Sequence, residues 1–316
     1  MATSLEPAAL VRRALGGERR SIARLISLVE DGGPDLGAAM EALYPHTGTA
    51  YSIGITGAPG AGKSSLTDRL VARARKDDKK VGVLAIDPSS PFSGGALLGD
   101  RVRMQGHATD EGVFIRSMAT RGHLGGLSLA APEAVRVLDA AGNDIVIIET
   151  VGVGQAEVEI TDACDTTLVI LNPGWGDAVQ AAKAGLMEIA DIYVINKADR
   201  PGTKDTHREL KNLIQMSDAD WKPEIVETVA IKNSGIDELW DAIGKHRAYQ
   251  EEKGLLEARR SRRIAREIKE IVAERYRERV EVEAAALLED LTKEVAGRKI
   301  DPYRAADRLI RSLAVE

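Results

Sequence analysis

The sequence predicts an α/β fold in which helices cover both faces of one mostly parallel sheet. Six short runs rich in β-branched residues alternate with longer segments of helical periodicity. Near-continuous apolar runs are typical of parallel strands that helices bury on both sides. A glycine-rich segment follows the first run directly and leads into a helical stretch, as in a doubly wound phosphate-binding domain. The runs are YSIGIT (51–56), VGVLAI (81–86), DIVIIE (144–149), TTLVIL (166–171), DIYVIN (191–196) and PEIVETV (223–229).

Helical segments are expected on either side of this core. Apolar residues recur at three- and four-residue spacing before Gly32-Gly33-Pro34, and the chain is charged and helical again after about Arg247. We therefore divide the chain into an N-terminal helical segment (1–48), a nucleotide-binding domain (49–247) and a C-terminal helical extension (248–316). The extension carries two apolar stripes, which include Ile264, Ile268, Ile271 and Val272, and then Leu287, Leu288, Leu291 and Val295.

Apolar stripes on a charged helix must be buried against another surface. That surface can be the core domain, another helix of the extension or a second copy of the chain. We expect a homodimer made through the extension, with packing onto the core as the alternative.

Composition excludes several classes of protein. The net charge is −6 among 316 residues, whereas a general binder of nucleic acid or of an anionic membrane needs a basic surface. No apolar run approaches the ~20 residues that span a bilayer. The single cysteine, Cys164, excludes an internal disulfide and fits a reducing compartment. These features predict a soluble cytoplasmic protein.

The segment GAPGAGKS (57–64) matches G-x-x-x-x-G-K-[ST] at every fixed position, between a strand and a helix. Glycines let the backbone wrap around phosphate, so that successive N–H groups point inward at the start of the helix. Lys63 can reach the β- and γ-phosphates, and the Ser64 hydroxyl can bind Mg²⁺. The predicted phosphate-binding residues are Gly57, Ala58, Pro59, Gly60, Ala61, Gly62, Lys63, Ser64 and Ser65.

A carboxylate at the end of a neighbouring strand should complete this site. Asp87 ends the second run, and Glu149 ends the third, at the start of ETVG (149–152). Many P-loop GTPases have Asp-x-x-Gly at this point; its glycine N–H senses the γ-phosphate and its carboxylate holds Mg²⁺ through water. Glu149 and Gly152 are therefore expected at the γ-phosphate, and the longer Glu149 side chain can address either the metal or the attacking water.

The sequence N-K-x-D follows the fifth run and predicts recognition of guanine. Asp199 can accept hydrogen bonds from the ring N–H and the exocyclic amine of guanine, a donor pair that adenine lacks. Asn196 is expected to brace the loops, and the Lys197 stem to pack over the base. A third contact is expected from the loop of Val229, Ala230 and Ile231, with the Ala230 N–H near the guanine oxygen. The motifs together predict a GTP hydrolase that binds GTP, GDP and Mg²⁺.

Four further segments resemble the MeaB/MMAA family, once labelled ArgK-type. They are AIDPSSPFSGGALLGDRVRM (85–104), FIRSMATRGHLGGLS (114–128), ETVGVGQAE (149–157) and NPGWGDAVQAAKAG (172–185). The resemblance runs from the N-terminal helices into the tail. It implies a P-loop fold of the SIMIBI-like branch, a homodimer, and a GTPase that acts as a chaperone of adenosylcobalamin-dependent acyl-CoA mutases.

The resemblance also implies roles for individual residues. Asp87 and Asp100 match aspartates assigned to Mg²⁺ and the first switch, and Glu149 matches an acidic residue implicated in hydrolysis. Residues 173–183 match a further switch loop through which the mutase is thought to accelerate hydrolysis, with Lys183 as its charged end. There are two departures: Val229-Ala230 replaces the usual Ser-Ala pair, and Trp175 takes the place of a residue that is often smaller.

The expected function is a Mg²⁺-dependent GTPase that gates cofactor loading of the mutase or protects it, with an adenosyltransferase as a further candidate partner. One alternative is a nickel metallochaperone, which would usually carry a Cys-x-Cys or His-rich segment; this chain has one cysteine and five dispersed histidines. The other is a P-loop kinase, for which no acceptor pocket or base is identifiable. Mutases of methylmalonyl-CoA, isobutyryl-CoA and 2-hydroxyisobutyryl-CoA are all candidate partners, because partner choice lies in surface detail.

Overall fold

A computed structural model of the protein describes residues 6–87, 105–107, 109–119, 126–150, 160, 163–174 and 189–313. The chain divides into two compact units, Met1–Arg263 and Ile264–Glu316. The three-part division made from the sequence, with boundaries near residues 48 and 247, stays a prediction.

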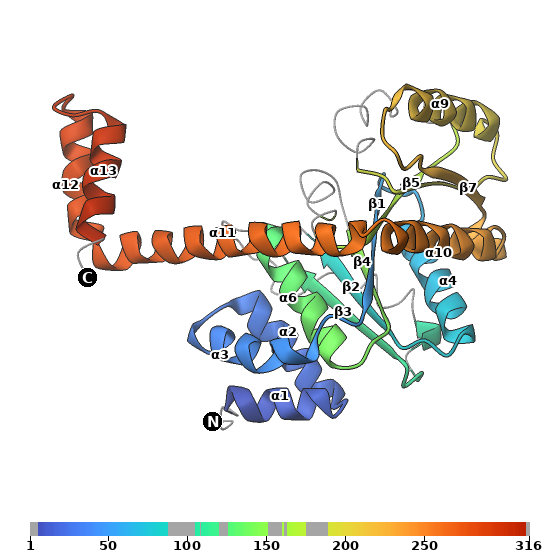
Figure 1. Cartoon of the computed structure of the whole chain (residues 1–316), viewed down its shortest axis with the longest axis horizontal. Helices are drawn as coiled ribbons and strands as arrows, with labels where there is room; N and C mark the ends of the chain where they lie inside the picture. The colour runs from blue at the N-terminus through green and yellow to red at the C-terminus, as the bar shows by residue number, and fades with distance from the viewer. Residues whose placement is uncertain are drawn as a thin grey trace. The chain divides into compact units, whose positions relative to one another are not determined.

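The described strands of the first unit form one seven-stranded sheet in which every pair is parallel. Its order is β3-β2-β4-β1-β5-β6-β7 (Figure 1), which confirms the predicted doubly wound α/β fold. The central strand β1 lies between β4 and β5, with Ile55 opposite Glu149 and Gly57 opposite Ile170. The strands are β1 (Tyr51–Gly57), β2 (Val81–Asp87), β3 (Val113–Ala119), β4 (Ile145–Thr150), β5 (Thr166–Leu171), β6 (Ile192–Asn196) and β7 (Glu224–Thr228).

The edge strand β3 was not among the six runs expected from the sequence. It pairs with β2 over its whole length, from Val113 opposite Val81 to Ala119 opposite Asp87. Arg116 and Ser117 interrupt its apolar pattern. An edge strand tolerates such residues: the Arg116 guanidinium reaches Ser27 and Glu30 on the second helix of the chain, at 2.7 and 3.1 Å.

Alternate residues of the strands face two separate cores, as the period of two requires. Ile53, Ile55 and Ile147 pack on one face, under α4 (Lys63–Lys76) and α10 (Ile236–Glu252). On the other face, Val146 and Ile148 pack under α6 and the N-terminal helices, and Val169 and Tyr193 under α9 (Figure 1). Besides the first turns of α11, the other described elements of this unit are α1 (Pro7–Leu15), α2 (Arg19–Asp31), α3 (Pro34–Leu43), α6 (Gly126–Ala140), α9 (Thr203–Met216), and the 3-10 turns η1 (Tyr44–His46), η2 (Gln105–His107) and η4 (Ala230–Lys232).

The second unit is helical. It contains most of α11 (Leu255–Glu283) together with α12 (Ala285–Ala296) and α13 (Pro302–Leu313). Leu291, Leu309 and Leu313 are buried there, whereas Leu288 and Ile310 are 41% and 50% exposed beside an apolar cavity of about 380 Å³. None of the described helices is long and apolar enough to cross a membrane.

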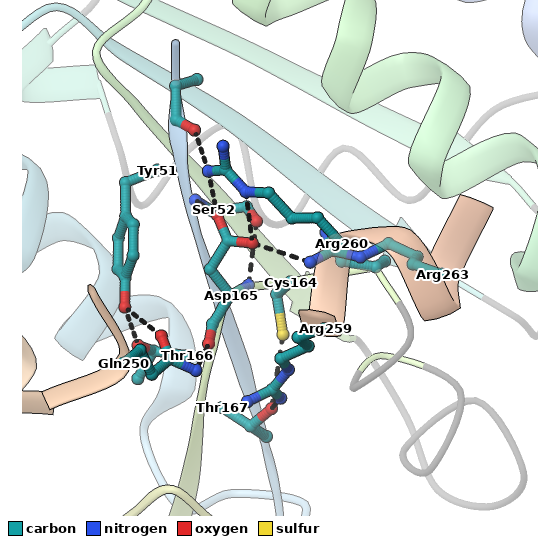
Figure 2. A network of polar contacts seen from close by, with 12 residues as sticks. Tyr51, Ser52, Cys164, Asp165, Thr166, Thr167, Gln250, Arg259, Arg260 and Arg263 are labelled. Atoms are coloured by element: carbon teal, nitrogen blue, oxygen red, sulfur yellow. Dashed lines mark hydrogen bonds and ion pairs between the residues drawn. The ribbon is translucent and has the colours of Figure 1, made fainter. Parts of the chain in front are cut away.

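The first turns of α11 bind a buried carboxylate at the start of β5. Asp165 is 1% exposed and accepts hydrogen bonds from Arg260 at 2.8 Å and from Arg263 at 2.7 Å. The Ser52 backbone N–H donates to the same carboxylate at 3.0 Å. Arg260 also donates to the carbonyl of Ala50. Figure 2 shows these residues, which we call the Asp165 cluster (Ser52, Asp165, Arg260 and Arg263). It ties α11 to the ends of β1 and β5 that lie opposite the P-loop.

Two further groups lie beside the Asp165 cluster. Arg259 donates to Asp191 at 2.9 Å, and Asp191 in turn accepts from the Thr167 N–H at 2.7 Å. Cys164 is fully buried, and this burial raises the pKa of its thiol to about 11. The cysteine is therefore a small structural residue, as its sequence context indicates.

Candidate functional site

The P-loop leaves β1 at Gly57 and enters α4 at Lys63. Two of its glycines are required by close packing as well as by backbone conformation. Gly57 has a φ of 129°, and a Cβ there would lie 2.1 Å from the carbonyl oxygen of Ile170 on β5. Gly62 has a φ of 90°, and a Cβ there would lie 2.5 Å from Asn196 Nδ2. The loop is thus fitted against β5 on one side and against the N-K-x-D segment on the other.

Lys63 is folded over this loop. Its ammonium is buried and donates to the carbonyl oxygens of Gly57 at 2.7 Å and Ala58 at 3.2 Å. These contacts hold the charge at the mouth of the loop. Because carbonyl oxygens are weaker partners for an ammonium than phosphate oxygens, a bound phosphate can replace them.

Glu149 lies at the end of β4 and is 1% exposed. Both carboxylate oxygens accept hydrogen bonds from hydroxyl groups of α4: Oε1 from Ser64 at 2.5 Å and Oε2 from Thr67 at 2.9 Å. The structure therefore brings together two of the residues expected to hold Mg²⁺. Hydroxyl and carboxylate oxygens are the hard donors that Mg²⁺ prefers, so this donor set fits the ion.

Asn196 connects the P-loop with the loop after β7. Its Nδ2 donates to the Ala61 carbonyl at 2.8 Å, and its Oδ1 accepts from Thr228 Oγ1 and the Ala230 N–H, each at 3.2 Å. This is the bracing geometry expected for the first residue of N-K-x-D. The Ala230 N–H, expected near the guanine oxygen, points to Asn196 in this structure.

A cavity of about 220 Å³ lies between the P-loop, the N-K-x-D segment and the loop after β7. Lys197 has a φ of 60°, and its ammonium reaches back to the Gly60 carbonyl at 2.5 Å. All of the lining residues except Arg200 were expected to contact the nucleotide, with Gly62 and Ser65 at the phosphates and the others at the base. The lining residues are Gly62, Ser65, Asn196, Lys197, Asp199, Arg200, Val229, Ala230 and Ile231.

Asp199 is paired with a residue that sequence reasoning missed. Lys232 Nζ donates to its Oδ2 at 2.8 Å, and this hydrogen bond lowers the pKa of the Asp199 carboxyl group. The carboxylate is thus ionised at neutral pH, as an acceptor for two guanine donors must be.

Several predicted residues lie outside the described part of the structure. These are Asp100, Gly152, Trp175 and Lys183, together with the side chain of Asp87, whose backbone ends β2. Pro173 and Gly174, at the start of the predicted switch loop, are described. A Cβ at Gly202 would lie 2.8 Å from the Gly174 nitrogen, so this turn contacts the segment that follows N-K-x-D.

The comparisons with known proteins agree with this geometry. Residues 22–285 match the family model described as "Methylmalonyl Co-A mutase-associated GTPase MeaB". The chain belongs to the MeaB family. It is a P-loop GTPase, and the match runs from α2 through the nucleotide-binding sheet to the start of α12.

Relatives of this MeaB chain cover nearly its whole length. A protein of Pyrococcus abyssi that carries a GTPase name is 51% identical over 310 residues, 96% of each chain. The methylmalonic aciduria type A homolog, mitochondrial, of Caenorhabditis elegans is 34% identical over 96% of this chain and 82% of its own. A crystal structure titled LAO/AO transport system kinase is 27% identical, with a TM-score of 0.69 and full coverage of both chains.

Thr67, Arg200 and Lys232 are the site residues of this MeaB chain that sequence reasoning missed. Thr67 lies one helical turn after Ser64, a spacing that places both side chains on one face of α4. That spacing is a signal that could have been used. Lys232 has no such signal, because its contact with Asp199 joins two loops 33 residues apart.

Proposed function

We propose that this GTPase is Mg²⁺-dependent and acts as a chaperone of an adenosylcobalamin-dependent acyl-CoA mutase. The observation that supports the mutase most directly is the family match, whose description names a mutase-associated GTPase and extends over residues 22–285. A relative named for methylmalonic aciduria type A points to the same metabolism. In this proposal, the GTPase gates cofactor loading of the mutase or protects it. The proposal also includes a homodimer, an adenosyltransferase as a further partner and a cytoplasmic location.

The arrangement of the phosphate site supports a role for each residue. The backbone N–H groups of 57–65, except at Pro59, which has none, would bind the phosphates. The Lys63 ammonium would exchange the Gly57 and Ala58 carbonyls for β- and γ-phosphate oxygens. Ser64, Glu149 and Asp87 would hold Mg²⁺, with Asp100 as the further candidate. The ion would neutralise charge that develops on the phosphates. Glu149, buried beside this point, would orient the attacking water.

The base site supports guanine as the base. Asp199 would accept from the ring N–H and the exocyclic amine, and Lys197 would cover one face of the ring. Val229, Ala230 and Ile231 line the opposite wall. For the Ala230 N–H to reach the guanine oxygen, it would turn from Asn196 Oδ1, a contact of 3.2 Å.

Acceleration by the mutase would act through the loop that begins at Pro173. We assign its charged end, Lys183, the role of stabilising negative charge in the transition state once the mutase orders the loop. The contact of Gly174 with Gly202 places the start of this loop beside the base-reading segment. A partner bound there would therefore be close to the base-reading segment.

The test is a GTPase assay with and without a methylmalonyl-CoA mutase from the same host, using wild type, Lys183→Ala and Lys63→Ala. Wild type should be accelerated by the mutase, and tenfold corresponds to only about 1.4 kcal/mol. Lys183→Ala should keep basal turnover and lose most of the acceleration, and Lys63→Ala should be inactive throughout. Equal acceleration of wild type and Lys183→Ala would remove this lysine from the mechanism.

A kinase activity is the second candidate, because the matched crystal structure is titled a transport system kinase. The same GTPase assay distinguishes a kinase from a mutase chaperone. Small acceptor molecules such as amino acids, added in place of the mutase, should leave GTP turnover unchanged and gain no phosphate. Phosphorylation of an acceptor would replace the chaperone proposal with a kinase.

A further inference from the structure

Thr67 contacts the carboxylate at the centre of the proposed hydrolytic site. It lies on α4, one turn after Ser64, and is fully buried. Its hydroxyl oxygen is 2.9 Å from Glu149 Oε2 and 3.0 Å from the Lys63 carbonyl oxygen. The family match does not single out this residue.

The proton of the Thr67 hydroxyl has two competing acceptors. A hydroxyl carries one hydrogen, and both the carbonyl and the carboxylate only accept. A bond to the carbonyl four residues earlier is a common local feature of helices and carries no function. A bond to an ionised carboxylate is about twice as strong as one to a neutral acceptor. An ionised Glu149 is therefore the preferred partner.

The hydrogen bond between Thr67 and Glu149 matters because the carboxylate is buried. Glu149 is 1% exposed, and a buried charge must be satisfied by donors because water is excluded. Ser64 binds Oε1 and Thr67 binds Oε2, so the two hydroxyls fix the plane of the carboxylate from one face of α4. Without Thr67, Oε2 would lose this donor while Ser64 still held Oε1.

We propose that Thr67 is a positioning residue that holds the Glu149 carboxylate in the orientation needed for hydrolysis. This inference depends on the role proposed above for Glu149. Thr67 does not touch the substrate. It keeps Oε2 in place, so that Oε1 stays directed at the Ser64 hydroxyl.

The experiment is a double-mutant cycle on the full chain with Thr67→Val, Glu149→Ala and the double variant. Thr67→Val keeps the shape of the side chain and removes the hydroxyl, and Thr67→Ser restores the hydroxyl. Thr206→Val is the matched control, because Thr206 is a buried helical threonine of α9, 3% exposed. For each variant we would measure kcat and KM for GTP, and the Mg²⁺ concentration that half-saturates binding of a fluorescent GDP.

The expected result is specific to a positioning role. Thr67→Val should lower kcat by about tenfold with little change in KM, and should raise the half-saturating Mg²⁺ concentration by about tenfold, as loss of an outer-shell partner does. Thr67→Ser should recover most of both losses. On the Glu149→Ala background, Thr67→Val should cause no further loss, because residues that act through one another are not additive.

Three results would overturn the inference: unchanged kcat in Thr67→Val, an equal loss on both backgrounds, or failure of Thr67→Ser to recover. Wild-type turnover in Glu149→Ala would instead refute the role proposed for Glu149, and this inference with it. If Thr67→Val does not fold, Thr67→Ala takes its place in the cycle, since alanine favours the helix and also lacks the hydroxyl.

Discussion

Substitution of Asp165 by asparagine should destabilise the first unit strongly, although the residue lies at the edge of the sheet opposite the nucleotide. The change removes one charge and keeps the shape of the side chain. It leaves Arg260 and Arg263 without the carboxylate that they bind at 2.8 and 2.7 Å. Removal of one partner of an ion pair is costly where the remaining charges are partly withdrawn from water, as Arg260 and Arg263 are.

The magnitude follows from the pKa of the Asp165 carboxyl group. Burial acts to raise this pKa, but the hydrogen bond from Arg260 and the charges of Arg263 and Arg260 outweigh it and lower the pKa from 3.8 to about 2. One pKa unit corresponds to about 1.4 kcal/mol, so the ionised carboxylate stabilises the folded state by about 2.5 kcal/mol. Because the pKa is lowered on folding, this contribution is complete above pH 3.8 and is lost as the pH falls towards 2.

Urea and thermal unfolding at pH 7 measure the effect. We expect Asp165→Asn to lose about 2.5 kcal/mol, or about 5–10 °C in Tm for a unit of this size. Asp205→Asn is the control, because Asp205 pairs with Arg208 on the surface, where both side chains are about two-thirds exposed. Such pairs contribute less than about 1 kcal/mol. A loss in Asp165→Asn no larger than that in Asp205→Asn would show that the cluster does not anchor α11.

Two further predictions concern the base site and the second unit. Asp199→Asn should weaken GTP binding on the order of tenfold to a hundredfold and relax the preference over ATP; calorimetry that finds both unchanged would contradict the base-reading assignment. Combined Leu288→Glu and Ile310→Glu should convert a dimer into a monomer in light scattering. Met216→Glu, an exposed apolar position on α9, should leave the dimer intact, and a double variant that stays dimeric would place the interface elsewhere.

Much of the fold could be predicted from the sequence, because six of the strands have the apolar pattern that burial between two helical layers imposes. Strand β3 could not, since an edge strand has one unpaired side and accepts Arg116 and Ser117. The glycines of the P-loop were recognised from their motif. The packing reason for two of them is visible only in the folded sheet: a side chain at Gly57 would collide with Ile170 of β5, and one at Gly62 with Asn196 of β6.

The residues of the candidate site also fall into those that the sequence predicts and those that it does not. Lys63, Ser64 and Asp199 belong to motifs that are continuous in sequence, so their positions could be predicted. Thr67 and Lys232 contact residues 82 and 33 positions away. The spacing of Thr67 from Ser64 could have shown that both side chains lie on one face of α4. No local pattern encodes the contact of Lys232 with Asp199, because it depends on which loops the topology brings together.

The Asp165 cluster also has a consequence for the order of events during synthesis. Its carboxylate is made 95 residues before Arg260 and 98 before Arg263, and Arg260 closes back on Gly48 across 212 residues. While the ribosome is still translating the segment between them, the Asp165 carboxylate lacks the two arginines that neutralise its charge in the folded protein. Chains grow from the N-terminus at ~5–20 residues per second, so this interval lasts ~5–20 s. Nascent chains that end before Arg263 should therefore remain protease-sensitive, and chains released just beyond it should become resistant.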